Sequence, residues 1–340
     1  MSRRAAVETL KYIWHHAGIA SLARRLHGGR GAILRYHSVT ADEAATLEYL
    51  DRGLMATTEA FAEQLGFIRE RYTVVTLDEM VERVHDGRPL PARAVAITFD
   101  DGYVDNYEHA YRLLRAAGLP ATFYVTTGAL DGGPALWTAK LRYMVRKTTR
   151  THVSLPAPLP ASAPIADDMD RQALFTTLIM ALKRVPGAQR CELVDALGPA
   201  LGVTDFSALD GIMMTWAQLR EMSNNGMTIG AHTVSHPNLP NTPVEEAETE
   251  IVGSRDAIAA KISGPVADFS YPNGRCGTHL NDTVKGNVRL ASFRSAVTSQ
   301  AGFIQIGADP WSLRRVGVYN RHRDMRSFSL DVERGRLASA

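Results

Sequence analysis

The sequence has few of the features that would place the protein in a membrane, in an oxidising compartment or on nucleic acid. No segment of the 340 residues approaches the roughly 20 consecutive apolar residues that a membrane span needs. The two cysteines, Cys191 and Cys276, stand far apart with no second thiol or histidine at metal spacing, which favours free thiols in a reducing compartment. A formal net charge of +2 is too small to indicate a nucleic-acid partner.

The N-terminus also lacks the continuous apolar stretch of a secretory signal. Lys11, His15 and His16 interrupt the apolar residues there, so a cleaved signal peptide is not expected and the protein is predicted to stay in the cytoplasm. No G-x-G-x-x-G or Walker loop follows any candidate strand, which leaves a dinucleotide or triphosphate cofactor without support.

Short apolar runs that alternate with helical stretches fill most of the chain. Strand followed by helix, repeated, is typical of a parallel sheet covered by helices. About seven or eight such units predict an α/β fold in the form of a (β/α) barrel with about seven strands, over residues 31–320. The rhythm breaks between about residues 128 and 214, and we interpret this part loop, part helical segment as an insertion that shapes a substrate groove.

Two segments flank the predicted barrel. Residues 1–30 are predicted as an amphipathic helix with Trp14 among its apolar residues, and residues 321–340 as a basic tail rich in arginine. Such segments are compatible with a peripheral contact to anionic lipids at the inner face of the cytoplasmic membrane. A helix packed on the barrel and a solvated tail are the alternative, and this is the favoured interpretation.

Two adjacent carboxylates follow a buried strand. The apolar run Ala94–Phe99 leads into Asp100, Asp101 and Gly102, and Asp-Asp-Gly alone is an ordinary turn signal. In a parallel barrel, however, active-site groups gather where the strands end. Two neighbouring carboxylates repel each other unless a cation or a proton intervenes, so this position is also a candidate site.

A pair of histidines follows another predicted strand. His232 and His236 come directly after the apolar run 227–231. At a spacing of four residues they would share one face of a helical turn and hold one metal ion together, and Pro237 would end that turn. A pair at this spacing is often accidental, but its position at a strand end favours a metal site.

Two further strand ends carry candidate residues. The run 269–274 ends in Pro-Asn-Gly, a strong turn signal that could also direct backbone N–H groups at a developing oxyanion. His37 ends the first predicted strand, Ala32–Tyr36. A lone histidine is usually structural, but this one is expected on the same rim as the others.

Taken together, these residues resemble the NodB-type polysaccharide deacetylases, also called carbohydrate esterase family four. Residues 98–102 match the T-F-D-D-G motif of that family, residues 232–236 match its H-[ST]-x-x-H motif, and residues 269–274 correspond to its third motif, R-P-P-Y. The resemblance covers about residues 32–318 without the insertion, and it implies a distorted (β/α) barrel.

The resemblance also implies an activity and the residues that carry it. Asp100 would be the general base, and a divalent metal would be bound by Asp101, His232 and His236. That metal is commonly zinc, with cobalt, nickel or manganese as alternatives. The implied reaction removes an N-acetyl group from an N-acetylated sugar in a polysaccharide, an oligosaccharide or a lipid-linked glycan, so carbohydrate is the expected partner.

This chain departs from the family pattern at two places. Ser270 stands where the family has an arginine that orients the base, and the late L-x-H motif appears at residues 313–315 as L-R-R, without its histidine. A subgroup with a permuted strand order has an early Y-H instead, which residues 36–37 resemble. We therefore predict His37 as the general acid and Arg315 as the replacement for the missing arginine.

The third motif contributes two more predicted residues. The backbone N–H of Asn273 is expected to hold the oxyanion, and Tyr271 is expected to contact the substrate in the same turn. Three other functions stay open for the chain: a deformylase or another amide hydrolase of non-peptide C–N bonds, a catalytically inactive carbohydrate-binding barrel, and a structural barrel with coincidental motifs.

Overall fold

Seven strands close into a barrel in which every neighbouring pair is parallel. The order around the ring is β1-β13-β11-β10-β9-β6-β5, and β5 pairs again with β1. This computed structural model, which describes residues 29–334, confirms the predicted α/β barrel of about seven strands. The strands are β1 (Arg30–Tyr36), β5 (Ala94–Phe99), β6 (Thr122–Val125), β9 (Thr228–Ala231), β10 (Asp268–Ser270), β11 (Ser295–Ala301) and β13 (Leu313–Gly317).

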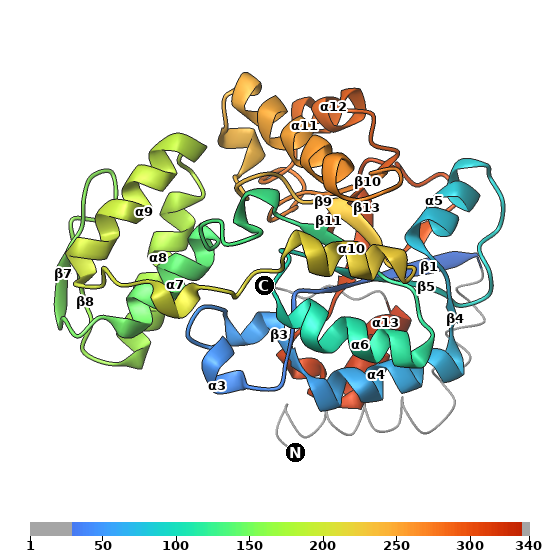
Figure 1. Cartoon of the computed structure of the whole chain (residues 1–340), viewed down its shortest axis with the longest axis horizontal. Coiled ribbons are helices and arrows are strands. Elements are labelled where there is room, and N and C mark those ends of the chain that lie inside the picture. The colour runs from blue at the N-terminus through green and yellow to red at the C-terminus, as the bar shows by residue number, and fades with distance from the viewer. Residues whose placement is uncertain (1–28, 335–340) are drawn as a thin grey trace, which may run out of the picture.

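Helices surround this ring of strands (Figure 1). They are α4 (Thr58–Arg71), α5 (Leu77–His85), α6 (Arg112–Ala117), α10 (Trp216–Asn224), α11 (Val244–Lys261), α12 (Asp282–Leu290) and α13 (Met325–Arg334). Smaller elements complete the sheet edges and the loops: β2 (Ser38–Thr40), α3 (Glu43–Thr46), β3 (Met55–Thr57), β4 (Thr73–Val74) and β12 (Ile304–Gln305).

Side chains on each barrel strand alternate between the helices and the interior, because successive residues of a strand point to opposite faces. On β5, Val95, Ile97 and Phe99 belong to the outer core that packs against the helices, whereas Ala94 and Ala96 belong to the inner core. Asp100 continues the inner series. The pleat therefore directs its carboxylate into the end of the barrel.

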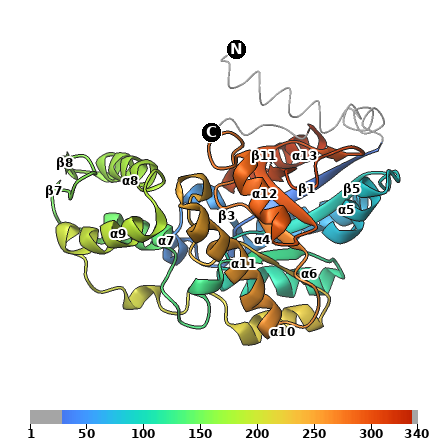
Figure 2. The same cartoon turned by 90° about the horizontal axis from the view of Figure 1, so that it is seen from above.

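The segment 137–201 forms a helical lobe beside the barrel (Figures 1 and 2). Its elements are α7 (Trp137–Lys147), β7 (His152–Ser154), β8 (Ser162–Pro164), α8 (Asp168–Leu182) and α9 (Gly187–Leu201). The lobe has its own apolar core, to which Leu50, Met55 and Tyr103 also contribute. It lies within the stretch where the strand–helix rhythm of the sequence breaks.

The two flanking segments differ from expectation where the structure describes them. The predicted helix of residues 1–30 lies outside the described residues except for its last two, and Arg30 begins β1 instead.

The predicted tail is wrong for residues 321–334, because α13 packs on the barrel through the fully buried Phe328. Arg321 pairs with Asp331 at 2.7 Å and Arg323 pairs with Glu43, so these two charges are already in ion pairs. Within the described range 29–334, no helix is long and apolar enough to cross a membrane.

Candidate metal centre and active site

The turn after β5 separates the two adjacent carboxylates. Asp101 adopts a left-handed backbone with φ of 80°, and Gly102 follows with φ of 93°. A Cβ on Gly102 would lie 3.2 Å from the side chain of Val125, so any other residue would crowd Val125 as well as strain the backbone. The carbonyl of Asp101 accepts a hydrogen bond from Thr126 N at 3.2 Å, which ties the turn to the end of β6.

The two histidines lie on a loop, so the predicted helical turn is wrong. Thr233 and His236 have φ of 66° and 59°, values that no α-helix contains. The loop nevertheless brings the two imidazole rings together, with centroids 5.0 Å apart and planes inclined by 66°. The two histidines at this spacing thus lie together as predicted, although not on a helical turn, and their role as metal ligands stays a prediction.

Asp101, His232 and His236 form one buried cluster. The Nε2 atoms of the two imidazoles lie 3.4 and 3.5 Å from the same atom, Oδ1 of Asp101. Nδ1 of His232 lies 2.6 Å from the carbonyl of Ser270, to which it donates, so Nε2 is the ring nitrogen that faces Asp101. The ligand atoms of all three residues lie within 4.8 Å of one another.

These separations fit a divalent ion better than they fit hydrogen bonds. A good N–H···O bond is about 2.9 Å long, whereas ligands arranged tetrahedrally around zinc, with bonds of about 2.1 Å, lie about 3.4 Å apart. Burial lowers the pKa of His236 to about 3, although the charge of Asp101 opposes the shift. His236 is therefore a neutral imidazole at pH 7, the form that binds metals.

Asp100 has a different and fully satisfied environment. The guanidinium of Arg315 donates to its two oxygens at 2.8 and 2.6 Å, and the hydroxyl of Ser270 donates to it at 3.1 Å. Arg315 is only 1% exposed, so the pair is shielded from water. Burial by itself raises the pKa of Asp100, but the charge of Arg315 leads the contributions that outweigh it and hold that pKa well below its usual range. The carboxylate is ionised at neutral pH.

Arg315, on β13, thus contacts the predicted base Asp100. This is the contact expected of a residue that replaces the arginine missing at position 270. Its Nε donates to the carbonyl of Thr298 at 2.8 Å, and one terminal nitrogen also donates to Ser270 Oγ at 3.1 Å. Ser270, which replaces the arginine of the third motif, is part of the same network. The role of Arg315 in orienting Asp100 remains a prediction.

His37 lies beside Asp100 because of the register between β1 and β5. Tyr36 is paired with Phe99, so His37 and Asp100 are the next residues on the two strands, and Asp100 N donates to the carbonyl of Tyr36 at 3.0 Å. Burial lowers the pKa of His37 to about 4, although the charges of Asp101 and Asp100 oppose the shift. Its Nδ1 is buried without a hydrogen-bond partner among the described residues.

The third motif contributes Asn273 to the same end of the barrel, but not the side chain of Tyr271. Asn273 has φ of 62°, and its Nδ2 is buried with no partner in the described part of the chain. Tyr271 points outward, where its ring packs 5.3 Å from Phe269 and its hydroxyl donates to the carbonyl of Trp311 at 2.9 Å. The predicted substrate contact of Tyr271 is therefore wrong, because the pleat that turns Ser270 inward turns the next residue outward.

Two residues that the sequence did not single out hold the histidine loop. Glu250 on α11 accepts hydrogen bonds from the backbone N–H of Val234 and of Ser235, both at 2.8 Å, and from Ser235 Oγ at 2.6 Å. Trp137 at the start of α7 donates its indole N–H to the carbonyl of His236 at 2.9 Å. No spacing rule connects either residue to the motif, so neither could be found from the sequence alone.

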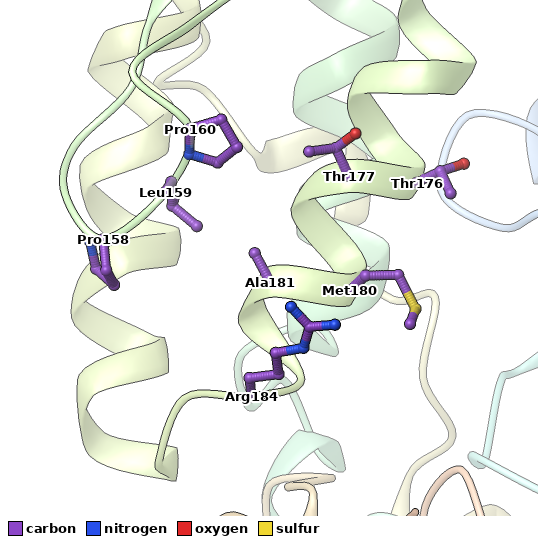
Figure 3. A pocket seen from close by; sticks show the side chains of 8 residues that line it. All are labelled: Pro158, Leu159, Pro160, Thr176, Thr177, Met180, Ala181 and Arg184. Carbon is purple, nitrogen blue, oxygen red and sulfur yellow. The ribbon is translucent and has the colours of Figure 1, made fainter.

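The helical lobe has a pocket of its own, and none of the predicted site residues lines it. Its volume is about 570 Å³, and it lies between the turn that joins β7 to β8 and one face of α8 (Figure 3). The lining residues are Pro158, Leu159, Pro160, Thr176, Thr177, Met180, Ala181 and Arg184. This mixture of apolar, hydroxyl and guanidinium groups contains no metal ligand or paired carboxylate.

Comparison with known proteins shows which family model the sequence matches and which solved structures share its fold. The family model described as polysaccharide deacetylase matches residues 87–155 and 200–294, on both sides of most of the helical lobe. The poly-β-1,6-N-acetyl-D-glucosamine N-deacetylase of Escherichia coli K12 is 37% identical over 98 residues, which is 28% of this chain and 14% of that protein. The chain thus aligns with only a small part of this curated relative.

Solved structures resemble the whole barrel at low identity. The Streptococcus pyogenes deacetylase PplD, in complex with acetate, superposes with a TM-score of 0.59 at 19% identity, covering 89% of this chain and 97% of that one. IcaB from Ammonifex degensii superposes with a TM-score of 0.57 at 17% identity, with the same two coverages. These likenesses concern the fold.

Proposed function

Because the chain belongs to the polysaccharide deacetylase family, we propose that it is a metal-dependent hydrolase that removes the N-acetyl group from an N-acetylated sugar of a polysaccharide, an oligosaccharide or a lipid-linked glycan. One observation carries the proposal. A ligand cluster of two imidazoles and a carboxylate lies next to a second carboxylate that Arg315 keeps ionised, at the end of the barrel where active sites form.

Asp101, His232 and His236 would hold the metal. Two nitrogen ligands and one oxygen ligand suit zinc, and cobalt, nickel or manganese accept the same donors. When bound, such an ion supplies Lewis-acid polarisation to an amide carbonyl and to a water molecule. The hydrogen bond from His232 Nδ1 to the carbonyl of Ser270 fixes which nitrogen faces the ion.

Asp100 is the proposed base. Arg315 and Ser270 fix the orientation of its carboxylate and keep it deprotonated, so it is ready to accept the proton of an attacking water. The low pKa of Asp100 makes the proton easy to pass on. His37, with a pKa of about 4, is the more basic of the two groups and lies on the neighbouring strand end.

His37 is the proposed acid that ends the reaction. The attack forms a C–O bond at the acyl carbon, and the C–N bond breaks when the nitrogen receives a proton, since an unprotonated amine anion cannot leave. A proton that passes from Asp100 to His37 supplies that need, and the products are acetate and a free amino sugar. Asn273, with its buried unpartnered Nδ2 and its backbone N–H, is the proposed donor to the oxyanion.

Release of acetate from N-acetylated oligosaccharides by the purified protein tests the proposed function. Acetate and free amino groups should appear in equal amounts. Both should disappear after dialysis against a chelator and return when zinc or cobalt is added. Formate instead of acetate would identify the deformylase alternative, and no product from any N-acylated sugar in the presence of zinc would contradict the proposal.

A further inference from the structure

His37 stands where the chain leaves the barrel. β1 ends at Tyr36, and β2 begins at Ser38 and pairs with β3 in a separate two-stranded sheet. The register between β1 and β5 ends at the pair of Tyr36 and Phe99. His37 therefore lies between two sheets and belongs to neither strand, so its position beside Asp100 depends on contacts outside the strand ladders.

Two consecutive polar residues, Asp105 and Asn106, supply such contacts. Nδ2 of Asn106 donates to the carbonyl of His37 at 2.7 Å and to Oδ1 of Asp105 at 2.8 Å. The other carboxylate oxygen of Asp105 accepts a hydrogen bond from the hydroxyl of Ser38. We call these three hydrogen bonds the His37 clamp, because they hold the main chain of His37 and the side chain of the next residue.

The His37 clamp comes from the segment that also carries the two adjacent carboxylates of the site. Asp105 and Asn106 follow the turn after β5, and this segment is itself anchored. The backbone N–H of Asn106 donates to the carbonyl of Tyr103 at 3.0 Å, and that of Val104 donates to the carbonyl of Ile212 at 2.8 Å. The clamp therefore ties the end of β1 directly to the segment that follows β5.

The His37 clamp is shielded from water. Ser38, Asp105 and Asn106 are all buried, and hydrogen bonds that water cannot replace keep a fixed geometry. Asn106 also begins a π-helical turn, Asn106–Tyr111, a rare geometry that occurs frequently at functional sites. Burial raises the pKa of Asp105 to about 7, and the hydrogen bonds from Ser38 and Asn106 oppose the shift. A hydroxyl can donate to a carboxylate or accept from a carboxyl group, so the clamp can persist in both protonation states.

We propose that Asp105 and Asn106 are positioning residues that hold His37 beside Asp100, where His37 can protonate the departing amine. The inference rests on the proposed function for its effect on turnover, and it adds two residues that no motif in the sequence singled out. Both act through the chain at residues 37–38 and not on the reacting atoms. Since a displacement of about 1 Å can lower a rate about 10²-fold, loosening the clamp should slow the step that needs the proton.

Asn106→Leu is the decisive variant, and Asn238→Leu is its matched control. Both asparagines are buried, and both have an Oδ1 atom without a partner among the described residues. Nδ2 of Asn106 donates to the carbonyl of His37 at 2.7 Å, and Nδ2 of Asn238 donates to the carbonyl of Lys183 at 2.9 Å. The two substitutions thus remove the same kind of buried hydrogen bond, but only the first removes one from His37.

Turnover of an amide and of an ester gives the kinetic readout. Asn106→Leu should lower the turnover of an N-acetyl sugar about tenfold or more, whereas an acetate ester with a good leaving group should lose far less. Asn238→Leu should lower both activities by the same factor, whatever its size. A loss in Asn106→Leu that is equal on amide and ester would mean that Asn106 does not act through the proposed acid.

Asp105 allows shape and charge to be separated. Asp105→Asn keeps the shape and can keep both hydrogen bonds, because the hydroxyl of Ser38 can accept as well as donate. Asp105→Leu removes both acceptors. Amide turnover should stay within about threefold of wild type in Asp105→Asn and should fall about tenfold or more in Asp105→Leu. Equal losses in the two variants would mean that Asp105 acts through its charge, which would overturn the positioning role assigned to it.

A measurement on His37 itself separates failure of this inference from failure of the proposed function. Protein with isotope-labelled histidine gives an NMR signal for the Cε1–H group of each imidazole, and the signal missing from His37→Gln belongs to His37. Asn106→Leu and Asp105→Leu should each shift that signal, and Asn238→Leu should leave it in place, even if the reaction proves not to be deacetylation. A His37 signal that is unchanged in Asn106→Leu and Asp105→Leu would overturn the inference.

Discussion

Asp100 and Asp101 are consecutive in the chain, yet their carboxylates meet opposite partners. Asp100 accepts two short hydrogen bonds from one buried guanidinium, at 2.8 and 2.6 Å. Asp101 faces two imidazole nitrogens at 3.4 and 3.5 Å, which is too far for good hydrogen bonds. Two chemically identical residues thus have different environments, because the left-handed turn at Asp101 directs their side chains to different neighbours. These environments suit the proposed base at Asp100 and the proposed metal ligand at Asp101.

The largest effect is expected from the two histidines that cluster with Asp101. His236→Ala and His232→Ala each remove one of three ligands, so metal content should fall close to zero and turnover should become undetectable. Elemental analysis of protein purified without chelator measures the first effect, and acetate release the second. His85→Ala removes an exposed histidine at the end of α5 and should change neither quantity. Full metal occupancy in both histidine variants would show that His232 and His236 are not metal ligands.

His37→Ala tests the acid next to the satisfied carboxylate. Turnover of an unactivated N-acetyl sugar should fall by about 10² or more, because the amine must be protonated before it leaves. An acetate ester with a good leaving group needs no such proton and should lose far less activity. The ratio of the two losses is the readout. Equal losses on amide and ester would indicate a structural or substrate-contact role for His37 instead.

Arg315→Lys changes the partner of Asp100 while keeping its charge. An ammonium cannot donate in parallel to both carboxylate oxygens, so kcat should fall about tenfold or more and the acid limb of the pH–rate profile should move to higher pH. The sign follows from the native pKa: Asp100 is held below its usual range, so its pairing stabilises the fold at neutral pH and is lost on acidification.

Thermal unfolding provides a second readout for Arg315→Lys. The variant should unfold at a lower temperature than wild type at pH 7, and the difference should shrink as the pH falls towards the pKa of Asp100. A pH–rate profile and a thermal stability that both match wild type would mean that Arg315 neither orients Asp100 nor sets its charge.

A smaller effect on metal binding is expected when a hydrogen bond that holds the histidine loop is removed. Trp137→Phe removes only the N–H that binds the carbonyl of His236, and loss of such an outer hydrogen bond typically weakens metal binding about tenfold. Competition with a chromogenic chelator measures the change in Kd for zinc. Trp311→Phe removes an equivalent indole bond, to the carbonyl of Phe293 at 3.0 Å, and should leave that Kd unchanged. Equal Kd values for the two variants would show that Trp137 does not support the metal site.

The sequence identified the parts of the site whose residue type is unusual for their place. Two acids and two histidines at strand ends have few structural explanations, so Asp100, Asp101, His232 and His236 could be predicted. The outward position of Tyr271 could also have been predicted, because the inward Ser270 precedes it on the same strand. The left-handed residues of the histidine loop could not, since φ at non-glycine positions depends on contacts made elsewhere.

The residues that support the site could not be predicted, because they lie outside the motifs in the sequence. Glu250 and Trp137 contact the histidine loop only because α11 and the helical lobe pack on either side of it. Arg321 and Arg323 looked like free charges of a basic tail, but their acidic partners, Asp331 and Glu43, become neighbours only in the fold. The predicted membrane contact and cytoplasmic location stay predictions.

Metal content and rate, measured together in Asp100→Asn and Asp101→Asn, test the division of labour most directly. Each variant keeps the shape of the side chain and removes one negative charge from the same turn. Asp100→Asn should retain about one zinc per chain while its rate falls by about 10² or more, whereas Asp101→Asn should lose most of the metal together with the activity. Loss of zinc from Asp100→Asn with retention in Asp101→Asn would contradict the account and reverse the two roles.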